Sequence, residues 1–196
     1  MPQAAATAAK GAATRAAILD RAIDLASAEG LEGLTIGRLA AEMEMSKSGL
    51  FGHFGSKEEL QLATVEAAAL RFRRAVIDPV LTIPDGADRL RAMIDAYLDH
   101  IDVGGYSGGC FWGSTAAEMD DRLGPVRDAI AAALDAWLAE LERQAGLAGL
   151  AHPDLVAFEL YSVVMGANLR YRLSKDRQVF DHARASVDRL LAEATK

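Results

Sequence analysis

The sequence predicts an all-α protein. Apolar residues recur three and four positions apart through most of the chain, which is the spacing of an amphipathic helix. Alternation of apolar and polar residues with a period of two, which is typical of a half-buried strand, is never sustained. With 196 residues, 51% of them hydrophobic, the chain can bury a substantial core. The apolar periodicity divides it into about nine helices.

The first part of the chain predicts a flexible arm followed by a helical module. The arm, residues 1–13, is nearly all Ala and Thr and lacks the Leu-rich run of a secretory signal. The module covers residues 14–60. We expect its first helix to begin at Thr14, a capping residue, and to stop at Gly30, because glycine favours helix ends.

Two short helices and the start of a long one complete the expected module. The second helix begins at Thr35, and after a tight link Ser46 caps a third helix that ends near Phe54. The run Ser56-Lys57-Glu58-Glu59 is a capping box, which predicts a fourth helix that reaches about Ile77.

Residues 61–196 are expected to form a larger helical body. Pro79 and Pro84 mark a break before its next helix, and residues 103–109 form a glycine-rich loop. Beyond the break, the expected helices cover residues 87–101, 110–119, 125–146, 153–169 and 179–191. Residues 155–169 are apolar almost all round, so we expect one side of that helix to face the core and the other a second subunit.

The distribution of charge permits binding to nucleic acid only at the N-terminal end. The net charge is −7, yet residues 10–76 carry equal numbers of basic and acidic residues, so the whole deficit falls in residues 77–196. An acidic body repels DNA and leaves the neutral N-terminal module to approach it. Charge alone does not establish DNA binding.

Cysteine content and hydropathy indicate a cytoplasmic protein without a membrane anchor. Cys110 is the single cysteine, so no intrachain disulfide can form, and the chain suits a reducing compartment. The longest apolar stretch, residues 155–169, is interrupted by Glu159 and is too short to span a bilayer comfortably.

A helix, a three-residue turn and a short exposed helix form the arrangement that places a recognition helix in the major groove of DNA. On the expected third helix, Leu50 and Phe54 share a narrow core face, while Ser48 and Gly52 lie on the opposite side. The outward surface is therefore small. Gly49 and Gly52 permit close approach of the backbone to a ligand, at a cost in helix propensity.

Three segments of the module resemble the signature of the tetracycline-repressor (TetR) family. They are Thr35-Ile-Gly-Arg-Leu-Ala-Ala-Glu-Met43, Ser46-Lys-Ser-Gly-Leu-Phe-Gly-His-Phe54 and Lys57-Glu-Glu-Leu60. The resemblance covers residues 14–67 with its spacing intact. Weaker similarity to a C-terminal variant of the family extends over segments beginning at Asp78, Gly109 and Gly124.

The resemblance implies DNA contacts at particular positions. Thr35 and Arg38 are expected to meet phosphates, and Lys57 to clamp the DNA backbone. Ser46, Lys47, Ser48 and Gly49 are expected at the start of the recognition helix. Phe51 replaces the family's usual tyrosine, so apolar contact with a sugar or a thymine methyl takes the place of a phenol-to-phosphate hydrogen bond. For His53, helix-end packing and phosphate contact both remain open.

The resemblance also implies the partners and the mode of action. A homodimer built on the last two long helices is expected to bind a pseudo-palindromic double-stranded operator as a repressor, and a small, largely apolar effector to release it. We expect aromatic, sulfur and polar residues of the body to line the effector pocket: Tyr97, Phe111, Trp112, Met119, Phe158, Tyr161, Met165 and Asn168. The alternative is a helical dimer that only scaffolds another protein.

Enzymatic and metal-dependent functions find little support. Gly105-Tyr-Ser-Gly-Gly109 matches the G-x-S-x-G elbow of hydrolases, and Asp154 and His182 follow in hydrolase order. That elbow requires a preceding strand, whereas the residues before it predict a helix end. None of the four histidines has a metal-binding residue three or four positions away, so we expect neither a metal nor a cofactor.

Overall fold

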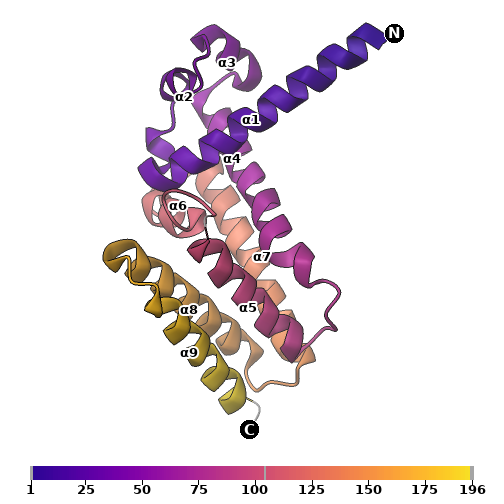
Figure 1. Ribbon diagram of the computed structural model, residues 1–196, viewed down its shortest axis with the longest axis vertical. Coiled ribbons are helices and arrows are strands. Elements are labelled where there is room, and N and C mark those ends of the chain that lie inside the picture. The colour runs from indigo at the N-terminus through magenta and orange to yellow at the C-terminus, as the bar shows by residue number, and fades with distance from the viewer. Residues whose placement is uncertain (1, 104, 195–196) are drawn as a thin grey trace. The chain divides into compact units, whose positions relative to one another are not determined.

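The structure is a computed structural model that describes residues 2–103 and 105–194. Within these residues it contains nine α-helices and no strand, which confirms the predicted fold class (Figure 1). The chain divides into two compact units. Unit 1 combines Met1–Ala68 with Tyr106–Ile130, and unit 2 combines Ala69–Gly105 with Ala131–Lys196.

Unit 1 contains the predicted helical module and one helix from much later in the chain. Its elements are α1 (Pro2–Gly33), α2 (Ile36–Glu42), α3 (Lys47–Phe54), most of α4 (Lys57–Phe72), α6 (Phe111–Met119) and the start of α7 (Pro125–Leu147). Ile18, Leu39, Leu50 and Phe111 are completely buried in its core. Helix α6 packs against α1 in the same unit, an association of distant segments that the sequence did not predict.

Unit 2 contains the remaining elements. After α4 the chain continues as a π-helix, η1 (Arg73–Ile77), and a short 3-10 helix, η2 (Asp78–Val80), followed by α5 (Ala87–Asp102), the rest of α7, α8 (Pro153–Ser174) and α9 (Gln178–Ala194). The expected helical path from Lys57 to Ile77 is therefore present, although its last turn widens to π-helical geometry.

The first helix begins earlier than predicted. α1 starts at Pro2, whereas Thr14 was expected to cap it, so the helix also runs through most of the segment expected to be an arm. Alanine has the highest helix propensity of any residue, and residues 2–13 are rich in it, which explains the longer helix. Whether residues 1–13 are flexible stays a prediction.

The predicted end of the first helix coincides with a break in α1. Gly30 has a φ of 82° and a ψ of 165°, outside the helical region. The N–H groups of Leu31 and Glu32, just beyond the break, donate hydrogen bonds of 2.6 and 3.0 Å to the carboxylate of Glu118 in α6. A Cβ on Gly30 would lie 2.4 Å from an oxygen of that carboxylate, so a side chain there would displace Glu118.

The loop before α6 is also bonded to α1. The N–H of Ser107 donates to the carboxylate of Asp24 at 2.8 Å, and that of Gly108 donates to Ser27 Oγ at 3.0 Å. A Cβ on Gly108 would lie only 1.9 Å from the carbonyl oxygen of Ser27, so this close approach requires glycine. Hydrogen bonds at both its ends thus attach the segment from Ser107 to Glu118 to α1.

Unit 2 is organised around three aromatic rings from three helices. The ring centroids of Phe72 and Tyr97 are 4.7 Å apart, those of Phe72 and Trp137 5.1 Å, and those of Tyr97 and Trp137 5.5 Å. All three pairs meet edge to face, the geometry that aromatic quadrupoles favour. These contacts join α4, α5 and α7 inside unit 2.

Candidate nucleic-acid interface

Helices α2 and α3 are joined by a tight turn that the sequence forms in an unusual way. At the end of α2, the N–H of Met45 bonds to the carbonyl of Ala40 at 2.9 Å, as in a Schellman motif. The residue that must then adopt positive φ is Glu44, with a φ of 54°. Glycine is usual at such a position, so Glu44 is held there at some conformational cost.

Side-chain caps begin all three helices of the motif, as predicted. Thr35 Oγ1 accepts from the N–H of Arg38 at 3.1 Å, and Ser46 Oγ accepts from that of Gly49 at the same distance. Ser56 Oγ accepts from the N–H of Glu59 at 3.1 Å. Each cap satisfies one of the donors that a helix N-terminus leaves unpaired.

The third helix buries one narrow face and exposes the rest. Leu50 and Phe54 are buried, as predicted from their spacing. The first turn of α3 is exposed, and so is the side chain of Phe51, at 54%. A surface aromatic beside small polar residues provides one apolar contact within a polar face. The exposed residues are Ser46, Lys47, Ser48, Gly49, Phe51 and Gly52.

Two of the predicted phosphate ligands form ion pairs within unit 1. The Arg38 guanidinium contacts Glu29 at 2.9 Å and Glu42 at 2.7 Å, which raises the pKa of Arg38 and lowers that of Glu42. Lys57 Nζ donates to the backbone carbonyl of Glu32 at 2.9 Å and to its carboxylate at 3.0 Å, which lowers the pKa of Glu32. Both cations therefore connect helices of the module.

Lys47 is placed differently. Among the described residues it forms no ion pair, and its side chain is exposed at the first position of α3. A Cβ built on Gly37 would lie 3.4 Å from Lys47 Cε and 3.7 Å from its Nζ, so the ammonium lies beside the first turn of α2. The positive ends of the α2 and α3 dipoles and the Lys47 charge thus add together, an arrangement that attracts anions.

Thr35 and His53 lie at the margins of this surface. Thr35 is exposed at the start of α2, and His53 is half-buried in the last turn of α3. The His53 ring lies 6.2 Å from that of Phe54. We define the recognition face as Thr35, Ser46, Lys47, Ser48, Gly49 and Phe51.

The eight residues predicted to line an effector pocket are divided between the two units, and the pocket stays a prediction. Phe111, Trp112 and Met119 are buried in unit 1, where the rings of Phe111 and Trp112 meet edge to face at 5.2 Å. The other five belong to unit 2. Of these, Tyr97 is buried in the aromatic cluster and Phe158 is 62% exposed, while three are partly exposed along α8: Tyr161, Met165 and Asn168.

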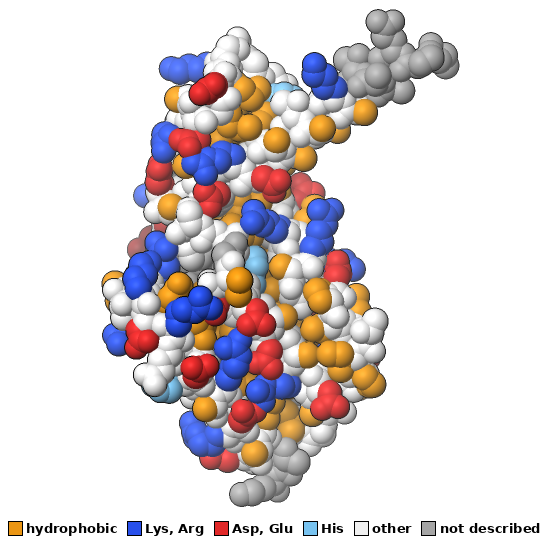
Figure 2. Space-filling view, viewed as in Figure 1, with side chains coloured by type: hydrophobic (Ala, Val, Ile, Leu, Met, Phe, Trp, Pro, Cys, Tyr) orange, Lys and Arg blue, Asp and Glu red, His pale blue; other side chains and the backbone are white. Residues whose placement is uncertain are grey.

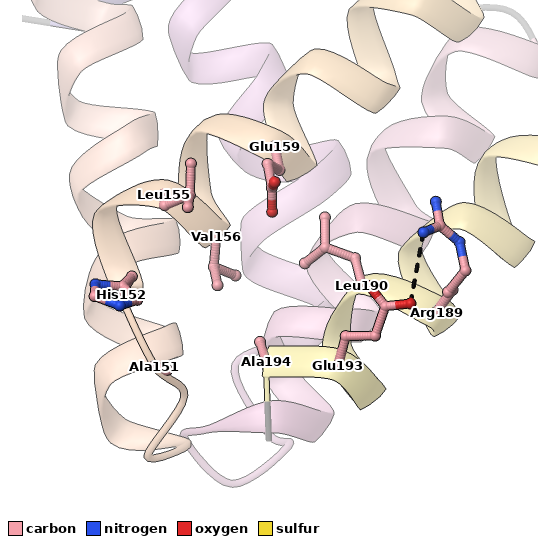
Figure 3. A pocket seen from close by; sticks show the side chains of 9 residues that line it. All are labelled: Ala151, His152, Leu155, Val156, Glu159, Arg189, Leu190, Glu193 and Ala194. Atoms are coloured by element: carbon pink, nitrogen blue, oxygen red, sulfur yellow. Dashed lines mark ion pairs between the residues drawn. The ribbon is translucent and has the colours of Figure 1, made fainter. Parts of the chain in front are cut away.

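A cavity of about 300 Å³ lies between the start of α8 and the end of α9 (Figure 3). Val156 and Leu190 line it, and at its edge Arg189 and Glu193 form an ion pair of 3.6 Å. A second cavity of similar volume in unit 2 is lined by Arg71, Ala75, Asp99, His100, Val103 and Gly105. None of the eight predicted pocket residues lines either cavity.

Large apolar side chains are exposed along one helix of unit 2. On α8, Leu155, Phe158, Leu169 and Leu173 are 49%, 62%, 61% and 75% exposed. Their spacing of three, eleven and four residues keeps them near one side of the helix, and Gly166 lies between them with no atom within 4 Å of its Cβ position. We call these four side chains the α8 stripe.

Neither a helix able to cross a membrane nor a cluster of metal-binding side chains is present in the residues that the structure describes. No helix in the described part of the chain has the length and hydropathy needed to cross a bilayer. The same residues contain no group of three or more side chains arranged to hold a metal ion. Over the face in view, acidic and basic side chains are interspersed (Figure 2).

Comparison with known proteins agrees with this geometry. Residues 18–64 match the family model described as bacterial regulatory proteins, tetR family, and residues 86–187 match that described as tetracyclin repressor-like, C-terminal domain. The HTH-type transcriptional repressor SCO4008 of Streptomyces coelicolor is 28% identical over 88 residues, or 45% of this chain. The aligned part spans only 42% of that curated relative.

Solved structures share the fold over nearly the whole chain. A TetR transcriptional regulator from Chloroflexus aurantiacus is 25% identical, with a TM-score of 0.83 over 95% of this chain and 96% of its own. AibR, solved in complex with isovaleryl coenzyme A and operator DNA, is 26% identical, with a TM-score of 0.71 over 88% of this chain and 97% of its own. Because the two family models together span most of the chain, the protein belongs to the TetR family of bacterial regulatory proteins.

Proposed function

We propose that the protein is a sequence-specific DNA-binding transcriptional regulator, a repressor that a small, largely apolar effector releases from its operator. The observation that carries this proposal is the recognition face. Lys47 has no ion-pair partner among the described residues, and its charge adds to the positive ends of two helices. The small residues around it permit close approach to a groove. A phosphate backbone is the ligand that best matches this combination.

Within the recognition face, we assign phosphate contact to Lys47 and Thr35. Ser48, Gly49 and Phe51 are assigned to base edges and sugars. Arg38 and Lys57 contact phosphate only by exchanging their carboxylate partners, so we expect their main part to be holding the module together. His53 is half-buried beside Phe54, which favours packing over phosphate contact.

We propose that two copies of the chain associate through the α8 stripe. Four large apolar side chains on one helix side are costly to leave in water, and Gly166 allows a second helix to approach closely. A two-fold dimer presents two recognition helices and therefore matches a pseudo-palindromic DNA site. AibR, a structural neighbour, was solved with operator DNA, which supports the DNA-binding part of this proposal.

The aromatic cluster of unit 2 supports binding of an apolar effector. Trp137 is buried, and its indole N–H has no hydrogen-bond partner in the described residues. A buried donor without a partner is costly, so an apolar compound with one acceptor group would gain affinity by accepting from Trp137. AibR was solved with isovaleryl coenzyme A, an organic ligand. By linkage, the effector must weaken DNA binding as much as DNA weakens effector binding.

We propose that the protein acts by binding and has no catalytic activity. The segment with G-x-S-x-G spacing follows helix α5, which extends to Asp102, so the strand that a nucleophile elbow requires is replaced by a helix. A DNA-binding role also implies a cytoplasmic location, the compartment expected from the single cysteine.

The DNA-binding proposal can be tested before the operator sequence is identified. The wild-type protein is used to select duplexes from a random library, and gel-shift titrations then compare it with Lys47→Ala and with Arg74→Ala. Arg74 is an exposed cation of unit 2 and serves as the matched control. We expect Lys47→Ala to lose affinity for the selected duplexes and Arg74→Ala to bind them as the wild type does. Selection of no duplex, with a stable dimer, would favour the scaffold alternative.

The effector proposal needs a separate measurement. Isothermal titration calorimetry measures the binding of apolar compounds to the wild type and to Trp137→Phe, with and without the selected duplex. The substitution removes the donor while keeping an aromatic ring. We expect compounds that bind the wild type to release DNA, and to bind the variant more weakly. Compounds that bind with no effect on DNA affinity would leave only the DNA-binding proposal standing.

A further inference from the structure

Helix α1 carries positive charge on its exposed first part. Residues 9–17 of α1 are exposed or half-buried, and the buried core of unit 1 begins only at Ile18. The sequence up to residue 19 contains Lys10 and Arg15 but no Asp or Glu. We call residues 9–17 the α1 arm. Helix α1 extends beyond the rest of unit 1 on the way to its N-terminus (Figure 1).

The two cations of the α1 arm are not neutralised by carboxylates. In the described part of the chain neither Lys10 nor Arg15 forms an ion pair, whereas Arg21, one turn and a half further on, pairs with Asp24 at 2.6 Å. Uncompensated charge is thus confined to the part of α1 that lies beyond the core. Such charge attracts an anionic partner over a distance of about one Debye length.

A contact inside unit 1 links the α1 arm to the recognition helix. The Arg15 guanidinium lies over the ring of Phe54, the last residue of α3, at 5.0 Å from the ring centroid. This cation–π contact leaves the guanidinium charge in place, because no proton or counter-charge is supplied. The arm therefore begins beside the recognition helix and leads away from it.

Helical geometry shows which side of the arm an anion would meet. Lys10 and Arg15 lie about 140° apart around the helix axis, and Gly11 and Thr14 fall between them. Ile18, which continues the same side, is fully buried, so this side turns toward the rest of unit 1. An anionic strand that lies along this side of the arm would meet Gly11 and Thr14, with Lys10 on one side of them and Arg15 on the other.

We propose that the α1 arm is a second DNA contact, which binds phosphates of the duplex next to the bases that α3 meets. The inference rests on the proposed DNA-binding function and extends it to DNA outside the recognition sequence. Lys10 and Arg15 lie about 7.5 Å apart along the helix axis, and one DNA strand carries a charge about every 3.4 Å of duplex axis, so both cations can meet phosphates of one short stretch of backbone. The contact is electrostatic and therefore independent of base sequence.

The test compares two duplexes that share the sequence selected by the wild-type protein. The short duplex ends at the selected sequence, and the long one continues with arbitrary flanks. The variants are Lys10→Gln with Arg15→Gln, Lys10→Gln alone, which keeps the contact with Phe54, and the control Arg74→Gln. Affinity is measured by gel shift over a range of salt concentrations.

We expect the double variant to lose about tenfold or more in affinity for the long duplex, with a salt slope reduced by up to about four for a dimer. The short duplex should bind the variant and the wild type alike, and Lys10→Gln should show a smaller loss on the long duplex only. Gly11→Ala, whose Cβ meets no atom within 4 Å, should strengthen the helix and tighten binding to the long duplex by up to about fivefold.

Specific results would overturn the proposal. An unchanged salt slope on the long duplex, or equal losses on both duplexes, would show that the arm only supports α3. Loss of binding to phosphatidylserine vesicles with unchanged DNA affinity would assign the arm to a lipid surface instead. If the wild type binds no duplex, the DNA-binding function fails together with this inference, whereas in the other cases only the inference fails.

Discussion

Unit 1 attaches α1 through hydrogen bonds to charged and polar groups, whereas unit 2 joins its helices through interlocking aromatic rings. The Glu118 carboxylate and Ser27 hydroxyl bond to backbone N–H groups over distances of 2.6 to 3.0 Å. The rings of Phe72, Tyr97 and Trp137 instead pack edge to face, with ring centroids 4.7 to 5.5 Å apart. A hydrogen bond weakens steeply as its angle departs from linearity, whereas apolar packing is the sum of many contacts that are each weak.

The exposed residues of the two units also differ in polarity. Unit 1 exposes small polar residues and Lys47, and unit 2 exposes the α8 stripe. A polar face with net positive charge suits a polyanion that must also be released, whereas an apolar face suits a partner that stays bound. The difference indicates that unit 1 is the part built to change its partner and unit 2 the part built to keep it.

The largest expected effect is on dimerisation, after a substitution in the α8 stripe. Phe158→Asp places a carboxylate in the middle of the α8 stripe, and a symmetric dimer would bury it twice. An unpaired buried charge costs several kcal/mol, so we expect dimerisation to weaken at least a hundredfold, by about 3 kcal/mol or more. Sedimentation equilibrium measures the change.

The matched control for this substitution is Leu147→Asp. Leu147 is exposed to a similar extent, 57%, but lies at the end of α7 rather than on α8. It should leave the dimer intact. Equal weakening by both substitutions, or by neither, would show that the two units do not differ as described.

The next largest effect is expected on the free energy of unfolding, after loss of the Glu118 carboxylate that bonds to α1. Glu118→Gln removes the charge that strengthens two backbone hydrogen bonds and turns an amide N–H₂ toward one of the backbone donors. We expect the free energy of unfolding to fall by about 2 kcal/mol. Urea unfolding measures the change.

Glu193→Gln is the control, because Glu193 is exposed and pairs with Arg189 only at 3.6 Å. It should change the free energy of unfolding by a few tenths of a kcal/mol. If Glu118→Gln has as little effect as this control, the carboxylate does not hold α1 in solution.

The cations of unit 1 should separate into two classes. Lys47→Ala should reduce affinity for the selected duplex about tenfold and the salt slope by about two for a dimer, because each protomer loses a phosphate contact. Lys57→Ala should instead lower the free energy of unfolding by about 1 kcal/mol, because it removes the bonds to Glu32. A loss of salt slope in Lys57→Ala equal to that in Lys47→Ala would show that DNA displaces Glu32.

The smallest effect is expected from a titratable group inside unit 2. Burial lowers the pKa of His100 from 6.5 to about 4, and the nearby charge of Arg71 acts in the same direction. The unfolded chain therefore binds a proton near pH 6.5 that the folded chain binds only near pH 4, so stability falls as the pH drops between these values. At about pH 5.5 the loss is roughly 1 kcal/mol per protomer relative to about pH 7.5.

His100→Gln should remove this part of the pH dependence. The measurement is the urea midpoint of the wild type and of the variant at both pH values. The lowered pKa values of Glu32 and Glu42 lie below 4.5, so these carboxylates stay ionised at both pH values of the measurement. An identical loss of stability in the wild type and the variant would contradict the assignment to His100.

Local signals in the sequence were sufficient for most of the fold. Capping residues Thr35, Ser46 and Ser56 begin helices as expected, because a cap acts on backbone groups two or three residues away. The core face of α3 followed from the spacing of Leu50 and Phe54 alone. The predicted start of α1 at Thr14 was wrong, because the helix propensity of the alanines before Thr14 outweighs its capping preference.

The candidate site was less accessible to sequence reasoning. Arg38 and Glu42 are four residues apart on one helix, so their pairing could have been predicted from spacing. The contact of Lys57 with Glu32, 25 residues away, depends on how two helices pack and left no local signal. The pocket stays a prediction. It rests on residue type, which carries no information on the unit or the burial of each residue: Phe111 is buried in unit 1 and Phe158 is exposed in unit 2.

The membership of Tyr106–Ile130 in unit 1 has a consequence for hybrid regulators assembled from two relatives. The N-terminal family model ends at residue 64, which suggests a junction shortly after it. A chimera joined there would keep Ser27 and Gly30 but take Gly108 and Glu118 from a different parent. Transplanting residues 1–68 together with 106–130 would carry both sides of each contact. This exchange has three junctions, two more than a single cut after the N-terminal family match, and we expect it to be required for a working transfer of DNA specificity.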